Sequence, residues 1–533
     1  MLTQRTAVEH DNICNSVLTC MNGLFTSDNR KFQDSVPCPF IAEGIQSRSV
    51  LEGSDTRMLM RIGGKEVEGI DETWIDVKNP ATSEFIDHVP AGTKEEVTLA
   101  TEAAENAFPP WAKKSMRDRG KILFQASQMV RDQYKDLARL LTLEQGKPLR
   151  ESTDEVREFA NILEFYAGVS ACQNGEVIQL GIAGDCMVIH QPLGVCGSII
   201  PWNMPVLIMG WKIGPALLAG NTMVLKPASA TPLTNLQLGR ILEEGGLPPG
   251  VLNIVTGSGE SVGMAMAKNT SIRKLSFTGD YETGCRIREI AGSSPKEITL
   301  ELGGSDPMIV MQDADIDKAV DGALRARFYN AGQTCTAVKR LYIHEKIAVA
   351  FIKKLKERVE ALTVGNGLGS KVDIGPMNSE RQREKISRRI EEARNNREGT
   401  ILTGGHSLKG TVYEKGYFYR PTLVTDVMPG SGLLTDEIFG PVLPIMTVPD
   451  LDCAIREANN TRFGLGASVW TKDLSIARRV FSEVNAGIIW VNRHLTVPPE
   501  VPFGGMSASG TGRENGQHAL DGYSQTKTLY LGW

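Results

Sequence analysis

Cys335 is the residue of this sequence whose type and surroundings are best suited to covalent catalysis. It lies in a loop of small residues, YNAGQTCTA, that follows a helical run. A cysteine thiolate is a strong nucleophile and can carry a covalent intermediate. No histidine lies within eight residues of Cys335, so a Cys–His pair has little support. Taken alone, the position is better explained as a buried, inert cysteine.

Glu301 and Asn203 are two further candidates for chemistry. Glu301 ends the apolar run ITLE and is followed by two glycines. Burial there would raise its pKa, as a general base near neutral pH requires, although an exposed strand-end acid is the favoured interpretation when Glu301 is taken alone. Asn203 lies in the proline-bracketed turn PWNMP. A buried amide must find hydrogen bonds, so Asn203 either stabilises the turn or donates to a developing oxyanion.

Glycine-rich turns after strands indicate a site for phosphate. The segment LNIVTGSGESVG is one residue longer than the usual dinucleotide fingerprint, and KLSFTGDYETG opens a helix at Gly279. The first turn of a helix holds phosphate through free backbone amides. Asp280 occupies this turn, which is unfavourable for an anion unless its side chain caps the helix. Lys226 ends the strand TMVLK, where α/β folds bind ligands.

Helices and strands alternate from Arg61 onward, which predicts an α/β fold with parallel sheets and helices on both faces. Apolar residues recur at helical spacing in five runs: 94–107, 117–141, 154–166, 233–244 and 379–396. Thr231-Pro232 predicts a polar cap with proline at the first helical position. The predicted strands are CMVIH, TMVLK, LNIV, KLSF, PMIV, RLYIH and GIIWV. Those after Leu302 are expected to form a second set, with TKTLYLGW as a late, separate strand.

The composition excludes several functional classes. The chain has 533 residues, of which 41% are hydrophobic and 23% charged, as in ordinary globular proteins. Its net charge of −5 argues against nucleic acid as a partner. We find no apolar run long enough to cross a membrane, and no spacing typical of metal ligands. Nine widely spaced cysteines suggest free thiols in a reducing compartment, so we expect a cytoplasmic location.

Residues 1–57 differ from the rest of the chain. They show no helical or strand period, and they lack the charged start and apolar core of a signal peptide. Their seven acidic residues also argue against a transit peptide. We therefore expect a poorly ordered extension, or an upstream start of the reading frame, with the folded unit beginning near Arg61.

Seven motifs occur together in one order: PWNMP, KPAS, SFTGDYETG, LELGG, GQTC, EIFGP and PFGG followed by SGTGRE. In this combination the sequence resembles the NAD(P)-dependent aldehyde dehydrogenase superfamily, from about residue 60 to the C-terminus. The resemblance implies a Rossmann-like cofactor domain, residues 58–174 and 193–303, and an α/β catalytic domain, residues 304–516. It also implies a small β oligomerisation element, residues 175–192 and 517–533, and hence a homodimer or homotetramer.

The resemblance assigns roles to the catalytic candidates. Cys335 is expected to attack an aldehyde and form a thiohemiacetal, with the Asn203 side chain and the Cys335 N–H as the oxyanion hole. Loss of hydride gives a thioester, and Glu301 is expected to activate water for its hydrolysis. Two alternatives remain: a CoA-acylating semialdehyde dehydrogenase, which usually lacks this acid, and a catalytically silent relative.

The resemblance also implies a cofactor site for NADP or NAD. Its expected residues are Ile200, Pro201, Trp202, Asn203, Lys226, Ala228, Ser229, Gly259, Gly263, Phe277, Thr278, Gly279, Asp280, Leu302, Glu437 and Phe439. Relatives with glutamate at the position of Ser229 usually favour NAD, because the carboxylate repels a 2′-phosphate. Ser229 removes that repulsion, so we expect NADP at least to be tolerated. Asp280 replaces the usual serine of the pyrophosphate loop and puts tight binding there in doubt.

The substrate is expected to be an aldehyde, with a short semialdehyde or hydroxyaldehyde as the specific hypothesis. The resemblance places Trp211 and Tyr329 along the substrate tunnel. Arg493 and His494 follow in the substrate-side loop and either clamp a carboxylate or are solvated.

Overall fold

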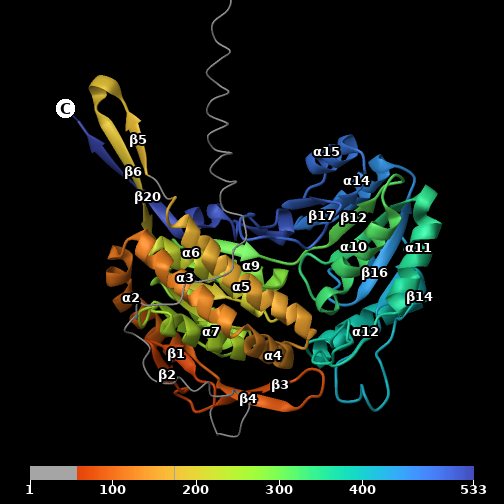
Figure 1. The fold of residues 1–533 in the computed structure, drawn as a ribbon, viewed down its shortest axis with the longest axis horizontal. Coiled ribbons are helices and arrows are strands. Elements are labelled where there is room, and N and C mark those ends of the chain that lie inside the picture. Colours follow the sequence, from red (N-terminus) through yellow and green to blue (C-terminus); the bar gives the residue numbers. More distant parts are fainter. Residues whose placement is uncertain (1–56, 173–174, 533) are drawn as a thin grey trace, which may run out of the picture. The chain divides into compact units, whose positions relative to one another are not determined.

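The computed structural model describes residues 57–172 and 175–532 (Figure 1). The predicted extension, residues 1–57, therefore lies outside the described residues except for Arg57. The α/β fold class is confirmed: helices pack around two large sheets, with two smaller antiparallel sheets beside them. The domain boundaries inferred from the sequence remain a proposal.

The first large sheet has eight strands in the order β19-β11-β10-β7-β8-β9-β1-β2. Their bounds are β1 Met60–Ile62, β2 Lys65–Val67, β7 Val195–Ile199, β8 Thr222–Lys226, β9 Leu252–Ile254, β10 Ile272–Thr278, β11 Glu297–Glu301 and β19 Gly510–Thr511. The five central strands, β11-β10-β7-β8-β9, run parallel, with Ile199 opposite Lys226 and Thr278 opposite Glu301. Their carboxyl ends therefore meet at one edge, where open α/β sheets bind ligands.

Helices cover both faces of this sheet. They are α2 Lys94–Lys113, α3 Met116–Asp132, α4 Tyr134–Gln145, α5 Leu149–Val169, α6 Pro205–Ala219, α7 Leu233–Glu244, α8 Met264–Lys268 and α9 Tyr281–Ala291. Alternate residues of β8 join different cores: Met223 and Leu225 pack with α3 to α7, and Val224 packs with α2, α8 and α9. A strand buried on both faces reads as a continuous apolar run, which explains the sequence TMVLK.

The second large sheet has seven strands in the order β14-β15-β16-β13-β12-β17-β18. The bounds are β12 Asp306–Val310, β13 Val338–His344, β14 Thr400–Thr403, β15 Thr422–Thr425, β16 Val442–Val448, β17 Gly466–Trp470 and β18 Ile488–Val491. Its helices are α10 Ile316–Phe328, α11 Glu345–Glu360, α12 Glu380–Asn395, α13 Gly432–Thr435, α14 Leu451–Asn459 and α15 Leu474–Glu483. The prediction that strands after Leu302 form a second set is confirmed, except that β19 joins the first sheet.

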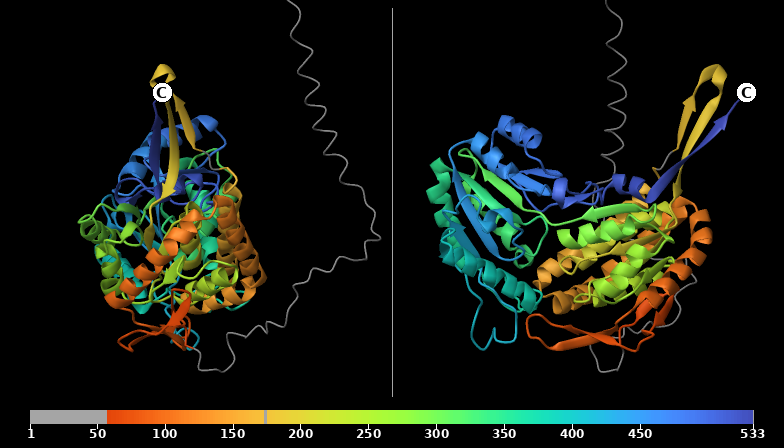
Figure 2. Two further views of the ribbon diagram at one scale, coloured as in Figure 1. Left: turned by 90° about the vertical axis from the view of Figure 1, so that its left-hand side faces the viewer. Right: turned by 180° about the vertical axis from the view of Figure 1, so that it is seen from behind.

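The late strand predicted from TKTLYLGW is β20, Ser524–Leu531. It pairs antiparallel with β6, Asp185–Pro192, which pairs in turn with β5, Glu176–Gln179. These three strands project from the rest of the described chain as an arm (Figures 1 and 2). The fourth sheet is a hairpin of β3, Trp74–Lys78, and β4, Phe85–Pro90.

Two of the predicted helix features are wrong. The single helix expected over 117–141 is two helices, α3 and α4, separated at Gln133. Thr231 does not cap α7, whose cap residue is Pro232 without a side-chain hydrogen bond. The carboxylate of Glu144 takes over, accepting from the backbone N–H groups of Leu233 at 2.8 Å and Thr234 at 2.9 Å. A carboxylate that is distant in the sequence can thus bind the free backbone N–H groups of a first helical turn as well as a local cap does.

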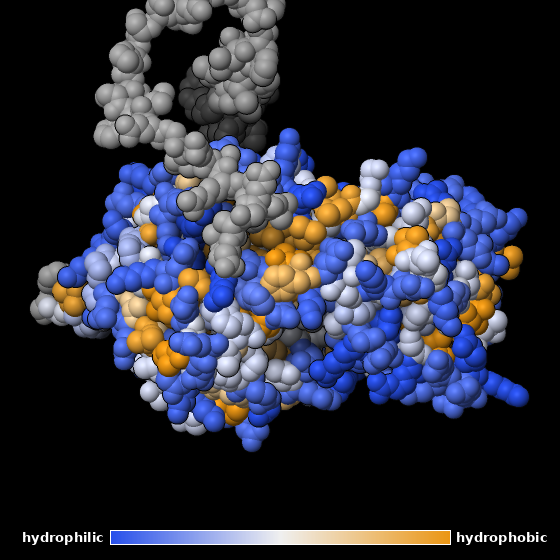
Figure 3. Space-filling view, turned by 90° about the horizontal axis from the view of Figure 1, so that it is seen from below, coloured by the Kyte–Doolittle hydropathy of each residue, from blue (hydrophilic) through white to orange (hydrophobic). Residues whose placement is uncertain are grey.

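The face of the molecule drawn in Figure 3 is mostly hydrophilic, with scattered hydrophobic patches. Among the described residues, no helix combines the length and the apolar character that crossing a membrane needs. The cysteines of the described part, Cys172, Cys186, Cys196, Cys285, Cys335 and Cys453, are all free thiols.

Candidate active site

The candidate residues converge on one cavity of about 1680 Å³. Strand ends of the first sheet, helices α5 and α6, and the loop that carries Cys335 form its walls. All the site residues predicted from the sequence line this cavity except Glu301, Gly263, Arg493 and His494. The parallel register of β7, β8, β10 and β11 brings their last residues to one edge of the sheet, where all four are buried: Ile199, Lys226, Thr278 and Glu301.

Cys335 lies between a distorted turn and β13. The turn Tyr329–Gly332 holds Asn330 and Ala331 with φ of 50° and 54°, in the left-handed region. The ammonium of Lys339 then fixes the loop by donating to the backbone carbonyls of Thr334 at 3.1 Å and Cys335 at 2.6 Å. Left-handed non-glycine residues at such a site store strain that the surrounding contacts must hold.

Burial raises the pKa of the Cys335 thiol to about 12, and Lys339 offsets only part of this effect. Carboxylates at Asp306, Glu437 and Glu301 raise it further. The thiol is therefore protonated at neutral pH in this conformation, and reaction requires its proton to be removed.

Asn203 directs its amide toward the Cys335 loop. Its Nδ2 donates to the backbone carbonyl of Gln333 at 3.0 Å. An amide nitrogen carries two hydrogens, so one remains for a ligand in the cavity that Asn203 lines. The arrangement suits an oxyanion hole for a carbonyl carbon bonded to Cys335.

Glu301 is buried, with 3% of its surface exposed, and its two carboxylate oxygens lack hydrogen-bond partners within the described chain. Burial raises its pKa well above the usual range, and the nearby Glu514 adds to the effect. Its carboxylate lies against Gly504, away from the cavity: a Cβ on Gly504 would come within 2.8 Å of Oε1. Glu301 thus lies beside the cavity, and its side chain must rotate to reach it.

Lys212 and Glu514 were given no role from the sequence, although Glu514 ends the motif SGTGRE. They form a buried ion pair next to Glu301, and both bind the hydroxyl of Ser276, at 2.8 Å and 2.7 Å respectively. One signal could have found Lys212: it is a lone cation in the most apolar stretch of the chain. Through its charges, the pair acts on the pKa of Glu301 in two directions, because Glu514 raises it and Lys212 lowers it.

The adenosine side of the expected cofactor site is formed by Lys226 and Ser229. Lys226 is buried, its Nζ donates to the Pro227 carbonyl at 3.0 Å, and burial lowers its pKa to about 8. Ser229 donates to the Gly257 carbonyl at 2.9 Å. Thr278 holds a buried hydroxyl without a partner in the described chain. Within the described residues, Lys226 has no carboxylate partner and Thr278 has an unsatisfied hydroxyl, and both lie at the carboxyl edge of the same sheet, which fits an anionic dinucleotide.

Asp280 is the N-cap of α9 and accepts from the Thr283 N–H at 2.9 Å. The carboxylate therefore occupies a first-turn amide that a pyrophosphate would otherwise use. Gly263 does not line the cavity, and a Cβ at this position would lie 3.8 Å from the Ile199 side chain and 3.9 Å from that of Lys226.

The other end of the cofactor site contains Glu437 and Phe439. Glu437 accepts from the Gly304 N–H at 3.1 Å and pairs with Lys339 at 3.3 Å. Phe439 meets the ring of Trp202 edge-on, with centroids 5.6 Å apart. Gln382 and Lys385 of α12 also line the cavity here, and no sequence motif pointed to them.

Arg493 and His494, expected either to clamp a substrate carboxylate or to be solvated, do not line this cavity. His494 is buried and holds Ser468 Oγ at 2.9 Å and the Thr336 carbonyl at 2.8 Å. Burial lowers its pKa to about 4, so it is neutral at physiological pH. Arg493 is exposed and does not line the cavity. Trp211, expected along the substrate tunnel, lines the cavity, and its ring centroid lies 4.8 Å from that of Phe503.

Comparison with known proteins decides the family. The model of the aldehyde dehydrogenase family matches residues 67–529. The chain belongs to the aldehyde dehydrogenase family. It is 41% identical over 473 residues to a betaine aldehyde dehydrogenase of Rhizobium etli, covering 88% of this chain and 96% of the relative. It is 40% identical over 492 residues to the mitochondrial aldehyde dehydrogenase family 2 member B4 of Arabidopsis thaliana, covering 92% and 90%.

Solved structures agree with this assignment. An NADP-dependent enzyme of E. coli superposes with a TM-score of 0.87 at 38% identity, covering 90% of this chain and 98% of the other. The betaine aldehyde dehydrogenase of Staphylococcus aureus in complex with NAD+ gives 0.87 at 34% identity, covering 89% and 94%. As an aldehyde dehydrogenase, the protein is an NAD(P)-dependent oxidoreductase that acts on aldehydes.

Proposed function

We propose that this aldehyde dehydrogenase oxidises its aldehyde to a free carboxylic acid through a covalent intermediate on Cys335. The observation that carries the proposal is the Asn203 amide, which is fixed on the loop of Cys335 with one N–H left for a ligand. The Cys335 thiol releases its proton to water in the cavity as its sulfur attacks the aldehyde carbon, which forms a carbon–sulfur bond and moves the carbonyl electron pair onto oxygen. The Asn203 amide and the Cys335 N–H then hold this oxyanion.

Bound NAD(P)+ supplies the hydride acceptor, and the product of that transfer on Cys335 is a thioester. Glu301 then takes a proton from the water that attacks the thioester, after its side chain turns toward the cavity. Burial and the neighbouring Glu514 raise the pKa of Glu301, which favours its uptake of that proton, and Glu301 then returns the proton to the departing Cys335 sulfur. The acid leaves and the Cys335 thiol is restored.

An end-product assay tests this proposal against the CoA-acylating alternative. The purified enzyme is incubated with aldehyde and NAD(P)+, with and without CoA, and reduced cofactor, free acid and acyl-CoA are measured. We expect one equivalent of free acid per reduced cofactor whether or not CoA is present. Accumulation of acyl-CoA would favour the alternative, and absence of reduced cofactor with every aldehyde would favour a silent relative.

We propose NADP as a cofactor used at least as well as NAD. The support is the serine at position 229, beside the buried cation of Lys226. The matching structure from E. coli is described as NADP-dependent, whereas the one from S. aureus holds NAD+.

For the substrate we propose an aldehyde with a cationic tail, in place of the semialdehyde suggested by Arg493 and His494. Glu158 of α5 and Glu500 both line the cavity, and Glu500 together with burial raises the pKa of Glu158. The wall also carries Arg157, whose guanidinium lies over the Tyr134 ring at 4.7 Å. Betaine aldehyde, named in several relatives, has such a tail.

A matched pair of aldehydes tests the tail. Betaine aldehyde and 3,3-dimethylbutanal have the same shape and differ by the positive charge. We expect a higher kcat/KM for betaine aldehyde than for this neutral analogue and for succinic semialdehyde. Glu158→Gln should reduce the difference in kcat/KM between betaine aldehyde and 3,3-dimethylbutanal. A higher kcat/KM for succinic semialdehyde would contradict the proposal and would favour a cavity that binds a substrate carboxylate.

We also propose that the protein is a homodimer or homotetramer assembled through the arm of β5, β6 and β20. The arm exposes large apolar side chains, which are costly in water unless a partner covers them. These are Val177, Ile178, Leu180, Ile182, Met187, Ile189, Leu529 and Tyr530. The predicted cytoplasmic location also remains a proposal, which fluorescence microscopy of the tagged full chain tests.

A further inference from the structure

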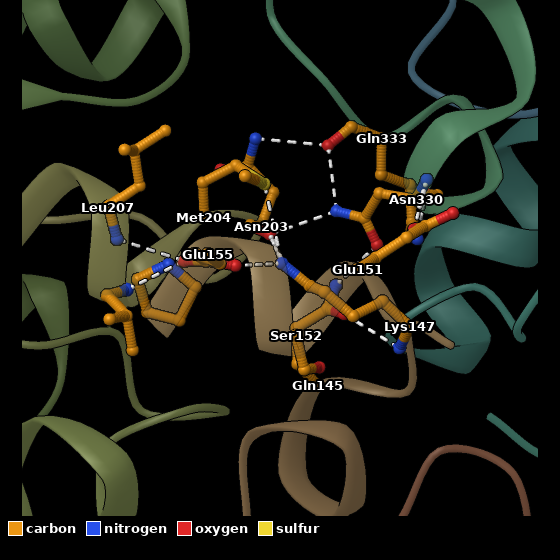
Figure 4. Close-up of polar contacts among 12 residues, drawn as sticks. Gln145, Lys147, Glu151, Ser152, Glu155, Asn203, Met204, Leu207, Asn330 and Gln333 are labelled. Atoms are coloured by element: carbon orange, nitrogen blue, oxygen red, sulfur yellow. Dashed lines mark hydrogen bonds and ion pairs between the residues drawn. The ribbon is translucent and has the colours of Figure 1, made fainter. Parts of the chain in front are cut away.

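A buried ion pair adjoins the part of the cavity wall that carries Asn203, and one of its members, Glu155, contributes to that wall. The side chains of Lys147 and Glu155 are both fully buried, and their charged groups are in contact (Figure 4). Buried ion pairs add little net stability, because desolvation of both charges offsets their attraction. The retention of two charges at this place therefore calls for a reason other than stability.

The ammonium of Lys147 reaches beyond Glu155 to the oxyanion donor. Its Nζ donates to the backbone carbonyl of Asn203 at 2.7 Å and lies 3.4 Å from the sulfur of Met204. The same carbonyl accepts from Asn330 Nδ2 at 2.9 Å. Asn203 is thus held at its carbonyl by two donors, while its side chain is held by Gln333.

The carboxylate of Glu155 fixes the chain that follows. Its Oε1 accepts from the backbone N–H groups of Val206 at 2.8 Å and Leu207 at 3.0 Å, at the start of α6. Lys147 and Glu155 together hold residues 203–207, immediately before and within the first turn of this helix (Figure 4).

The loop of Cys335 is tied to the same group of residues. Asn330 donates from its backbone N–H to Glu151 of α5 at 2.8 Å, and its Oδ1 accepts from Gln145 at 3.0 Å. Its Nδ2 also reaches the Gln333 carbonyl at 3.3 Å, the group that orients the Asn203 amide. The segments of the oxyanion donor and of the nucleophile therefore share one buried network.

We propose that Lys147, neutralised by Glu155, is a positioning residue for the oxyanion hole. By holding the Asn203 carbonyl, it sets the peptide plane from which the side chain projects, so that the free amide N–H faces the oxygen of an aldehyde bonded to Cys335. A donor aligned before the reaction stabilises the developing charge without reorganisation. The inference rests on the proposed role of Asn203 as the oxyanion donor.

The double variant Lys147→Met/Glu155→Gln tests the proposal. Methionine fills the space of the lysine stem, and the glutamine Oε1 can still accept from Val206 and Leu207, so no unpaired charge is left behind. We measure the single-turnover burst of reduced cofactor by stopped-flow absorbance. The expected result is a burst rate at least 10-fold lower, with KM for the cofactor and the thermal unfolding midpoint close to wild type.

A combination with Asn203→Ala separates positioning from a general structural effect. Loss of one oxyanion donor lowers the rate about 100- to 1000-fold. If Lys147 acts through Asn203, adding the double variant to Asn203→Ala lowers the burst no further, since residues that act as a unit are not additive. Losses that multiply independently would overturn the proposal.

Glu144→Gln is the matched control. Glu144 is an equally buried carboxylate that accepts from two backbone N–H groups at the start of another helix, α7, and it makes no bond to Asn203. We expect this variant to keep the wild-type burst rate. A loss equal to that of the double variant would show that any disturbance of the core slows the reaction, and would overturn the proposal.

Asn330→Gly serves if the double variant does not fold. It removes the second donor to the Asn203 carbonyl and tolerates the left-handed φ of 50°. We again expect a slower burst that is not additive with Asn203→Ala, and a normal burst would overturn the proposal. A failure of the proposed function would give a different result, because Asn203→Ala or Cys335→Ala would then leave the burst of reduced cofactor intact.

Discussion

Replacing Ser229 by glutamate should turn the enzyme against NADP. The serine is partly exposed on the cavity wall and its hydroxyl is bonded to the Gly257 carbonyl, so a longer side chain at this position extends into the cavity. A carboxylate about 6 Å from a phosphate of charge about −2 is repelled by about 3 kcal/mol at an effective dielectric constant of about 40. Solvent screening lowers this value, so we expect kcat/KM for NADP to fall by roughly 10- to 100-fold.

NAD has a hydroxyl where NADP has the 2′-phosphate, so the same carboxylate gains a hydrogen-bond donor and kcat/KM for NAD should be preserved. The assay is steady-state absorbance of the reduced cofactor with saturating aldehyde, for wild type and Ser229→Glu. Ser229→Gln is the control, because glutamine has the volume of glutamate without its charge. Only the glutamate variant should discriminate between the two cofactors.

Two results would refute this reasoning. If wild type already prefers NAD by about 100-fold, equal to about 2.7 kcal/mol, then another residue sets the choice of cofactor. If Ser229→Glu and Ser229→Gln reduce the use of NADP equally, the effect comes from side-chain volume and the electrostatic argument fails.

Three further predictions concern the chemistry, the pH dependence and the assembly. Cys335→Ala should abolish the burst of reduced cofactor, whereas Glu301→Gln should keep one burst and lose at least 100-fold in steady-state turnover, as rapid-mixing absorbance can show; normal turnover in either variant contradicts the assignment. The pKa of Lys226 near 8 means that the cation exists below this pH and is lost above it. Hence kcat/KM for NADP should fall as pH rises through about 8, more steeply than for NAD, and parallel pH profiles would argue against Lys226 as the phosphate partner. Deleting residues 524–533, which removes β20, should give monomers by light scattering, and an unchanged mass would place the interface elsewhere.

The sequence predicted those parts of the site that depend on local rules. Lys226 and Thr278 each end a strand, and parallel strands bring their carboxyl ends to one edge, so their meeting at the cavity follows from the topology. The turn at Asn203 and the loop of Cys335 were found as motifs. The cap of α9 at Asp280 was recognisable for the same reason, since a helix start is a local signal.

Interactions between distant segments could not be predicted in this way. Lys212 and Glu514 meet only because α6 and the C-terminal loop pack on the same side of β10, and neither residue carries a local signal of its partner. The capping of α7 by Glu144 has the same origin. His494 failed as a predicted ligand because its burial and both of its hydrogen bonds are tertiary facts.

The short strand β19, which is among the last segments to be synthesised, covers the edge of the strand that carries Glu301. It pairs with β11 so that Gly510 lies opposite Glu301, and Ser509 accepts from the Leu302 N–H at 2.9 Å. A nascent chain on the ribosome that has not reached Gly510 leaves this edge of β11 open to solvent, and it also lacks Glu514. Pairing between segments so far apart in the sequence is slow, because the intervening chain must be ordered first. A premature stop codon or a proteolytic cut shortly before Gly510 would therefore leave Glu301, the proposed water-activating acid, on an unpaired strand edge while the loop of Cys335 is still present in the chain.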